Sequence, residues 1–281
     1  MQAKVSNEAH GAAMSKTRIS LDHAAASLAM PERRRQIRAL IQQNTQGSVA
    51  DLATRFGVSA VTIRTDLAAL EHMGAVVRTH GGALPRSDSD ELPIDVKQTL
   101  NRAEKVRIAT AALELIRGGE TIILDSGTTT AEIAKQLRTL KLPSINVITN
   151  ALNIAALLAN SPHVNVIMPG GILRQKSWSL SGPQAEQALS TLQADVLFLG
   201  VDSLDPEIGL MTPYPLEAQL NAQMIRIARQ VVAVTDSSKL LRRNLSVISP
   251  VDQVDILITD NRADADCVEA IRGKGVEVRL V

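Results

Sequence analysis

The spacing of apolar positions divides this chain into two parts. Between residues 32 and 73, apolar side chains recur at helical intervals, which predicts three short helices over 32–43, 49–56 and 60–73. Beyond residue 100, short runs that are apolar throughout alternate with Ala-rich amphipathic stretches. Strands without polar alternation are typical of a mainly parallel sheet with helices on both faces, so the larger part is predicted to be an α/β domain.

Seven apolar runs are predicted to be strands, at 121–124, 146–149, 165–168, 196–201, 231–235, 255–259 and 276–280. Helices are predicted at 131–140, 151–160 and 184–192. The polar, acidic stretch 86–100 contains a proline and is predicted to be a linker. Residues 1–30 lack a sustained period and a secretion signal, which predicts a flexible tail. The expected order is therefore a tail (1–30), a small helical module (31–85), a linker (86–100) and the α/β domain (101–281).

Turn signals within residues 31–85 agree with the helical spacing. Gly57 and Ser59 supply a tight turn and a helix cap between the second and third predicted helices. The third helix is predicted to bury four apolar side chains, Val61, Ile63, Leu67 and Leu70. After it, the alternating stretch 75–83 with its Gly-Gly pair predicts a hairpin. Together these elements predict a winged helix-turn-helix.

The outward face of the third helix carries side chains expected to contact duplex DNA. A recognition helix presents its first turns to base edges in the major groove, where an arginine such as Arg64 pairs with guanine O6 and N7. Basic side chains of the first helix and the hairpin are expected on the neighbouring phosphates. The predicted DNA-binding residues are Arg33, Arg34, Ser59, Ala60, Thr62, Arg64, Thr65, Arg78 and His80. Two alternatives stay open: a helical packing domain without DNA, or first-helix arginines that bind another protein.

Charge and composition support a duplex as the partner of the small module. The net charge is only +1, but residues 31–86 have a balance of +4 and residues 87–281 a balance of −4. A basic module on an acidic body indicates a polyanionic partner for the module. With two Phe, one Tyr and one Trp in the chain, base stacking on single strands is disfavoured. The single cysteine excludes an internal disulfide and suits a reducing cytoplasm, and no apolar run approaches the ~20 residues of a membrane helix.

A hydroxyl-rich turn at 125–130 joins a predicted strand to a predicted helix. Free N–H groups at a helix N-terminus favour a phosphate there, and open α/β sheets bind ligands beyond the carboxyl ends of their strands. Each polar strand end taken alone is also explained by turn formation. The site predicted for a small anionic, polyhydroxylated ligand comprises Asp125, Ser126, Gly127, Thr128, Thr129, Thr130, Thr149, Asn150, Gly170, Gly171, Asp202, Glu217 and Lys239. Nucleotide-binding fingerprints are missing and the histidines are scattered, so no cofactor or metal is expected.

Both parts of the chain resemble the DeoR-type transcriptional repressors. The resemblance covers residues 31–281 and rests on segments 58–67, 77–83, 124–130, 149–150, 170–171, 200–202 and 236–239. Segments 123–134 and 182–187 are most similar to the repressors of N-acetylgalactosamine operons. The sequence departs from the family pattern at Thr65 and Leu240, where many members have arginine and phenylalanine, and at 212–215 beside Glu217.

The resemblance implies a winged helix-turn-helix joined to a sensor domain similar in fold to ribose-5-phosphate isomerase. Such a protein represses a sugar catabolic operon, here one for an amino sugar, and leaves its double-stranded operator when a phosphorylated sugar binds the sensor. The turn 125–130 would hold the phosphate, and the other predicted ligand residues would line the sugar. Because helix-turn-helix proteins read paired half-sites, a homo-oligomer, dimer or tetramer, is expected.

One alternative function is a phosphosugar isomerase with an appended DNA-binding domain. In that enzyme Glu217 would abstract a proton and Lys239 would steady the enediolate. A shared fold does not transfer chemistry, so the repressor is preferred and no catalytic residue is expected.

Overall fold

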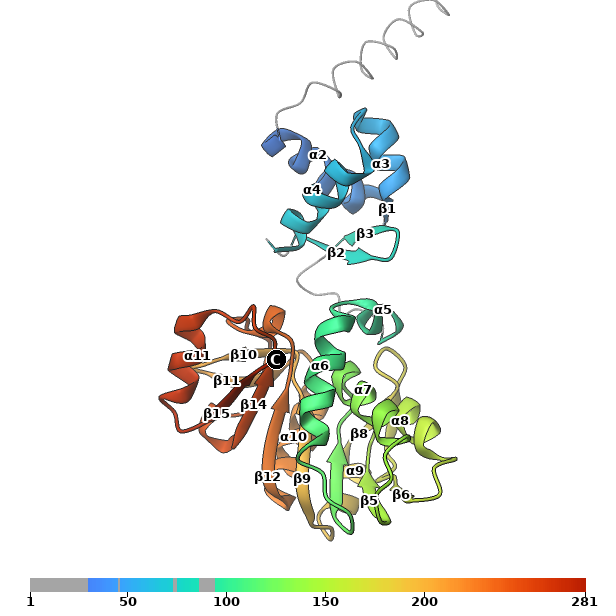
Figure 1. Ribbon diagram of the computed structural model, residues 1–281, viewed down its shortest axis with the longest axis vertical. Helices are drawn as coiled ribbons and strands as arrows, with labels where there is room; N and C mark the ends of the chain where they lie inside the picture. The colour runs from blue at the N-terminus through green and yellow to red at the C-terminus, as the bar shows by residue number, and fades with distance from the viewer. Residues whose placement is uncertain (1–29, 45, 73–74, 86–93) are drawn as a thin grey trace, which may run out of the picture. The chain divides into compact units, whose positions relative to one another are not determined.

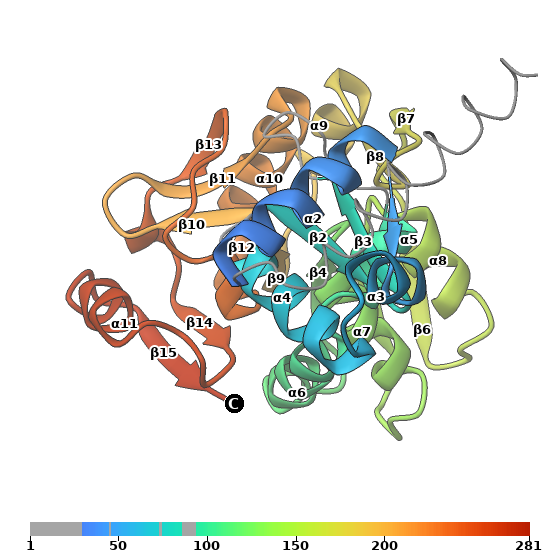
Figure 2. The same ribbon diagram turned by 90° about the horizontal axis from the view of Figure 1, so that it is seen from above.

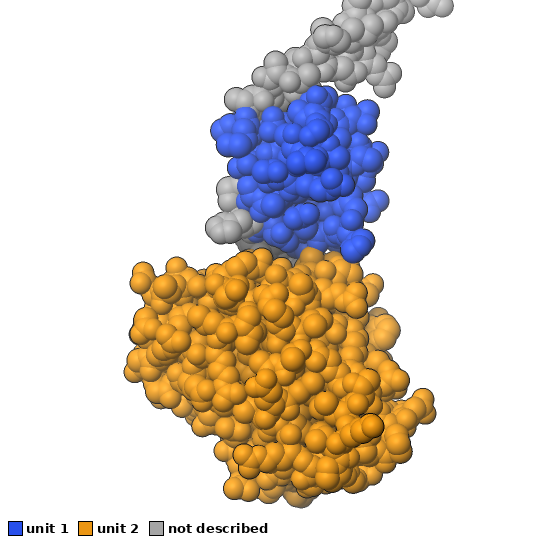
Figure 3. All heavy atoms as spheres, viewed as in Figure 1, with its two compact units in different colours: residues 1–90 blue, residues 91–281 orange. Residues whose placement is uncertain are grey.

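The computed structural model describes residues 30–44, 46–72, 75–85 and 94–281. The predicted tail apart from Met30, and residues 86–93 of the predicted linker, lie outside the described residues. The chain forms two compact units, residues 1–90 and residues 91–281 (Figure 3).

Unit 1 is a winged helix-turn-helix, as predicted. Its elements are α2 (Met30–Asn44), β1 (Gly47–Ser48), α3 (Val49–Phe56), α4 (Ala60–His72), β2 (Val76–Thr79) and β3 (Gly82–Pro85) (Figure 1). The Ser48 hydroxyl accepts a hydrogen bond from the Asp51 N–H and caps α3, and the Ser59 hydroxyl accepts one from the Thr62 N–H at the start of α4. Gly57 has the left-handed φ of 61° that the turn between these helices requires.

The core of unit 1 lies between its three helices and the hairpin. Its fully buried side chains include Ile37, Ile41, Leu52, Phe56, Ile63, Leu67 and Leu70. The prediction that Val61 is buried is wrong, because its residue surface is 67% exposed. At 100° per residue, Val61 lies 200° around α4 from Ile63, so it cannot share the inward face with Ile63, Leu67 and Leu70.

The wing turns one residue earlier than the Gly-Gly pair indicates. Strands β2 and β3 pair antiparallel from Val76 opposite Pro85 to Thr79 opposite Gly82, so His80 and Gly81 form the loop. Gly82 also pairs with Ser48 of β1. A Cβ built on Gly82 would lie 2.0 Å from the Gly47 carbonyl oxygen, so only glycine allows β1 and β3 to approach this closely.

Unit 2 is built on a seven-stranded parallel sheet in the order β15-β14-β12-β9-β4-β5-β6. Its strands are β4 (Thr121–Leu124), β5 (Ile145–Ile148), β6 (Val164–Ile167), β9 (Ala194–Gly200), β12 (Ala228–Val234), β14 (Ile256–Thr259) and β15 (Glu277–Leu280). Each overlaps one of the seven strands predicted from the sequence, so the predicted parallel α/β architecture is confirmed.

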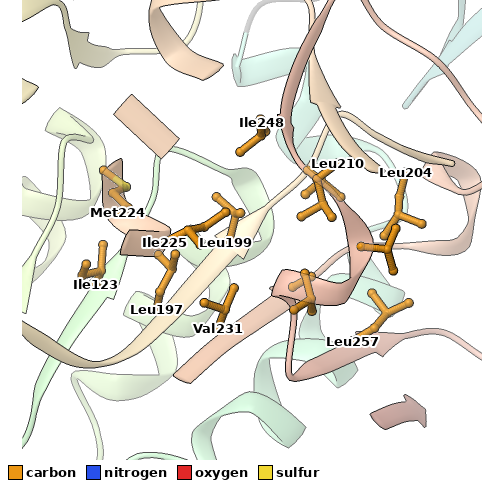
Figure 4. Close-up of a cluster of buried hydrophobic side chains, with 14 of the residues drawn as sticks. Ile123, Leu197, Leu199, Leu204, Leu210, Met224, Ile225, Val231, Ile248 and Leu257 are labelled. Carbon is orange, nitrogen blue, oxygen red and sulfur yellow. The ribbon is translucent and has the colours of Figure 1, made fainter. Parts of the chain in front are cut away.

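Helices cover both faces of this sheet because neighbouring strand residues point to opposite sides. Ile122 and Leu124 belong to a core with helices α6 (Arg102–Leu113), α7 (Thr128–Leu137) and α8 (Leu152–Leu158). Ile123 belongs to the opposite core with α9 (Pro183–Leu189), α10 (Pro215–Ile227) and α11 (Ala265–Arg272), part of which is drawn in Figure 4. Figure 2 shows α6 and α7 on one side of β4 and β9, and α9 and α10 on the other.

Several short elements of unit 2 have no counterpart in the sequence prediction. Strands β7 (Ile172–Arg174) and β8 (Ser179–Ser181) form a hairpin, and β10 (Ser203–Asp205), β11 (Gly209–Thr212) and β13 (Ser246–Ser249) form a small antiparallel sheet. Part of the predicted linker is also ordered: Ile94–Thr99 is helix α5, with Ile94 buried and its N–H bonded to the Lys176 carbonyl. No helix among the described residues is long and apolar enough to cross a membrane.

Candidate functional site

The strand order of unit 2 reverses between β4 and β9. The chain runs from β4 to β5 and β6 on one side, and from β9 to β12, β14 and β15 on the other. Ligands of open α/β sheets bind at such a switch point, outside the carboxyl ends of the strands. The loops that follow β4 and β9 touch there, since a Cβ built on Gly200 would lie 3.3 Å from the Gly127 Cα. The predicted turn 125–130 and the predicted Asp202 therefore belong to one place in the fold.

Asp125 holds the turn after β4 in its shape. Its Oδ1 accepts hydrogen bonds from the Gly127 N–H and the Thr130 hydroxyl, both at 2.9 Å. Burial raises the pKa of Asp125 to about 6, although these hydrogen bonds lower it. Asp125 and Thr130 thus face the protein. The backbone N–H groups at the start of α7 and the half-buried Thr128 can meet a ligand, while the predicted Ser126 and Thr129 are more deeply buried beside them.

Asp202 is paired with the Lys97 ammonium and also interacts electrostatically with the Lys239 ammonium. Its Oδ1 is 3.1 Å from Lys97 Nζ, and its Oδ2 accepts a hydrogen bond of 3.3 Å from the Thr212 hydroxyl. Burial by itself raises the pKa of Asp202, but Lys97 and Lys239 outweigh burial and hold that pKa below its usual value. Burial lowers the pKa of Lys239, an effect that Asp202 opposes. The structure thus brings the predicted Asp202 and Lys239 together.

Lys97 is a site residue that the sequence prediction missed. It lies on α5, within the predicted linker, and its partner Asp202 is 105 residues away in the chain. The following segment is also tied to the site. Buried Lys105 donates to the Lys97 and Leu100 carbonyls at 2.7 Å each, and Asn101 donates to the Asp236 carboxylate at 2.8 Å. No spacing in the sequence signals these contacts, because they arise where α5 and α6 pack on the strand ends.

Glu217 is the acidic residue that α10 contributes to the site. It is buried at the start of α10, and its Oε2 is 3.2 Å from Arg174 Nη1. The Arg174 guanidinium lies over the Tyr214 ring, 4.3 Å from the centroid, so this β7 side chain is held by a carboxylate and an aromatic face. Burial, assisted by the negative charge of Asp202, raises the pKa of Glu217 to about 7. Arg174 is the second cation that the sequence prediction missed.

A Glu217→Gln variant should become more stable than the parent protein as pH rises. A carboxyl group whose folded pKa of about 7 exceeds the usual glutamate value of 4.5 contributes its full stability below pH 4.5 and loses that contribution as pH rises through 7. Near pH 4 the two proteins should have similar free energies of unfolding, whereas near pH 8 the variant should gain about 3 kcal/mol. Urea unfolding can be followed through Trp178, the single tryptophan, which lies in unit 2.

The matched control for that measurement is Glu269→Gln, because the Glu269 side chain is exposed. Its free energy of unfolding should differ from that of the parent protein by less than that of Glu217→Gln does near pH 8. A Glu217→Gln gain that is equally large near pH 4 would contradict a raised pKa.

Four predicted residues shape the edge of the site. The Thr149 hydroxyl accepts from the Ala151 N–H, and the Asn150 side chain donates to the Leu180 carbonyl of β8. Gly170 and Gly171 have positive φ angles of 76° and 112°. Asn150 thus contacts the β7–β8 hairpin, which carries Arg174, and the two glycines lead into that hairpin. Among them Asn150 keeps a buried side-chain oxygen without a hydrogen-bond partner among the described residues.

The predicted DNA-binding residues of unit 1 fall into two groups. Ser59, Arg64, Thr65 and His80 are exposed, whereas Ala60, Thr62 and Arg78 are partly buried. Arg33 and Arg34 have an internal partner, since their Nε atoms lie 2.6 and 2.9 Å from the two carboxylate oxygens of buried Asp66. These ion pairs join α2 to α4. We therefore assign both arginines first to holding the module together.

Metal ligation finds no support in the described ranges, where no group of three or more His, Cys, Asp or Glu side chains is placed to hold an ion.

Two family models match this chain. The DeoR-like helix-turn-helix domain matches residues 33–88, and the DeoR C terminal sensor domain matches residues 100–261. The first match covers the predicted DNA-binding residues, and the second covers the residues of the unit 2 site except Lys97.

Similar proteins span nearly the whole chain. A protein of Escherichia coli O157:H7, named as a candidate aga operon transcriptional repressor, is 45% identical over 89% of this chain and 93% of its own length. The transcriptional regulator GlpR of Haloferax volcanii is 38% identical over 88% of this chain and 96% of its own. The glycerol-3-phosphate regulon repressor of Escherichia coli K12 is 28% identical over 89% and 98%.

Solved structures are similar at a lower level. Ribose 5-phosphate isomerase A of Methanocaldococcus jannaschii aligns with a TM-score of 0.37 and 19% identity over 50% of this chain and 55% of that one. A translation initiation factor eIF-2B of Pyrococcus horikoshii aligns with a TM-score of 0.45 and 16% identity over 83% and 82%. Scores at this level carry no conclusion about chemistry.

Proposed function

The chain belongs to the DeoR family of transcriptional regulators, and on that premise we propose that it holds the operator of a sugar operon until a phosphorylated sugar releases it. One observation carries the proposal. A single chain joins a winged helix-turn-helix to an α/β unit whose cations and helix N-terminus meet at the β4–β9 switch point.

The effector site has separate groups for a phosphate and for hydroxyls. The N–H groups at the start of α7 supply donors, and the ammoniums of Lys97 and Lys239 supply positive charge. Asp202 and Glu217 can accept hydrogen bonds from sugar hydroxyls. Since one relative is named for an aga operon and another for glycerol 3-phosphate, we favour a phosphorylated amino sugar and keep glycerol 3-phosphate as the competing probe.

Release requires a difference in affinity between two states of the protein. The sugar phosphate must bind the state that does not hold DNA more tightly than the state that does. We further propose that the repressor acts in the cytoplasm as a dimer or tetramer, because paired half-sites call for paired helix-turn-helix units.

The experiment that tests this function combines a ligand screen with DNA release. Phosphorylated amino sugars and glycerol 3-phosphate are tested for a rise in melting temperature, since a ligand that binds only the folded state stabilises it by mass action. A compound that raises the melting temperature should also dissociate the complex with DNA from upstream of the operon. If no phosphosugar does both, the proposal fails on the effector side.

We propose that unit 2 binds the sugar phosphate without converting it. The relatives named above are regulators and repressors by name, and Glu217 is already engaged by Arg174. Incubation of the protein with each stabilising phosphosugar should leave the sugar unchanged by NMR. Turnover that Glu217→Gln abolishes would establish the isomerase instead.

An Arg64→Ala variant should bind operator DNA about 10- to 100-fold more weakly, because it loses a bidentate contact to guanine. Affinity for unrelated duplex should fall much less, since that binding depends on the sum of phosphate contacts. Fluorescence anisotropy with operator and with unrelated duplex, at several salt concentrations, separates the loss of specific binding from the loss of non-specific binding. The control is Arg107→Ala, an exposed arginine of α6 in unit 2. An unchanged operator affinity for Arg64→Ala would favour a protein-binding role for unit 1.

A further inference from the structure

Val61 is the most exposed of the large apolar side chains in the described part of unit 1. It occupies the second position of α4 and is 67% exposed, while the large apolar residues Ile63, Leu67 and Leu70 of that helix face the core. A valine in an exposed helical position costs helix stability relative to alanine, because its branched side chain loses rotamer freedom. Packing within the unit does not offset that cost. Contacts within unit 1 therefore do not explain why this position is a valine, and a binding partner of unit 1 is the alternative.

The polar neighbours of Val61 have their hydroxyl groups engaged within α4. The Thr65 hydroxyl donates to the Val61 carbonyl at 3.1 Å, and the Thr62 hydroxyl is paired with the Ser59 hydroxyl at 2.9 Å. Arg64 follows one helical turn after Val61 and is exposed. Among the described residues at the outward start of α4, Val61 therefore supplies the large apolar side chain and Arg64 the guanidinium group.

Each of these groups matches one base in the major groove. Thymine is the base that displays a methyl group there, and apolar side chains contact it, whereas guanine displays the paired acceptors that arginine recognises. Resting on the proposed DNA-binding function, we propose that Val61 reads the 5-methyl group of a thymine in each operator half-site, next to the guanine read by Arg64.

The helix geometry also fixes the distance between the two bases. Val61 and Arg64 are three residues apart, which is about 4.5 Å along a helix axis at 1.5 Å per residue. Base pairs rise by about 3.4 Å. The thymine and the guanine therefore lie about one or two base pairs apart in the half-site.

The test removes the methyl group without altering any hydrogen bond of the base. A duplex is first selected from a randomised pool by the wild-type protein, and each thymine is then replaced singly by deoxyuridine. One position in each half-site should weaken wild-type binding about fourfold, the effect of losing one buried methyl group. Val61→Ala should bind the parent duplex weaker by a similar factor and lose nothing further at that uracil. Such non-additivity identifies direct contact.

Val106→Ala is the matched control, because Val106 is an exposed valine in a helix of unit 2. It should keep the wild-type response to every uracil. The proposal is overturned if no uracil weakens wild-type binding, or if Val61→Ala and the uracil replacements act additively at every position. If the wild-type protein selects no duplex over random DNA, the DNA-binding function itself fails, which separates the two failures.

Discussion

Asp66→Ala is expected to unfold unit 1 at much lower denaturant concentration while unit 2 keeps its transition. The Asp66 side chain is 2% exposed and is the internal partner of Arg33 and Arg34, whose side chains are 14% and 20% exposed. Removing one partner of a buried charge cluster leaves the others uncompensated, at a cost of about 3–5 kcal/mol. Because both guanidiniums keep some exposure and can turn to water, we expect a loss near the lower end of that range.

Two signals separate the units in this experiment. Trp178 fluorescence reports unit 2, whereas far-ultraviolet circular dichroism reports helices of both units. The variant should lose part of its helix signal at lower denaturant concentration, while its tryptophan transition stays unshifted. DNA binding should be lost at the same denaturant concentration as that helix signal. Glu32→Ala, which removes the partner of exposed Arg35, is the control and should shift the helix transition far less than Asp66→Ala does.

A further variant distinguishes lost charge pairing from lost packing. Replacing the cluster by apolar side chains, Arg33→Met, Arg34→Met and Asp66→Leu together, should restore most of the stability, since buried ion pairs are often replaced without loss. An Asp66→Ala protein whose helix signal melts like wild type would show that these pairs behave as ordinary surface contacts.

Lys239→Met is expected to lose the response to the sugar phosphate. The Lys239 ammonium lies in the partly buried cluster with Lys97 and Asp202, where burial already lowers its pKa. Losing a charge-assisted hydrogen bond to a phosphate costs about 1.5–3 kcal/mol, or roughly 10- to 100-fold in affinity. The readout is the ratio of operator affinity with and without the stabilising phosphosugar, which should approach one in the variant.

Lys274→Met is the control for that experiment, since Lys274 is a partly exposed lysine paired with exposed Glu207. It should keep the wild-type ratio and the wild-type rise in melting temperature. Full release of DNA from Lys239→Met at the wild-type effector concentration would remove Lys239 from the effector site.

Local sequence patterns predict most helices and strands of this protein, but they do not predict the long-range contacts between them. All seven strands of the parallel sheet were predictable, because strands buried on both faces are apolar throughout. The strands of the β7–β8 hairpin and of the small antiparallel sheet were not predicted, because each combines polar or glycine residues with apolar ones and is too short to show a clear alternation. On α4 the apolar pattern failed at one position, where Asp66 completes the buried face and Val61 lies outside it.

In the candidate site of unit 2, some residues were predictable from local patterns and others were not. Asp125, Asp202, Glu217 and Lys239 were predictable as polar residues that follow strands or begin helices. Lys97 and Arg174 were not, because their partners lie 105 and 43 residues away in the chain. Local sequence patterns do not indicate which distant loops come into contact in the folded chain.

The sequence by itself determined the two-unit organisation, the helix-turn-helix, the parallel α/β unit and the family, since these follow from periodicity, turn residues and contiguous motifs. Only the tertiary structure decided the order of the strands, and with it the place where the loops after β4 and β9 meet. It also decided the roles of individual charges: Arg33 and Arg34 pair with Asp66, while Lys97 joins Asp202. The physical reason is that an ion pair depends on distance in space and on burial, and crossover connections set both.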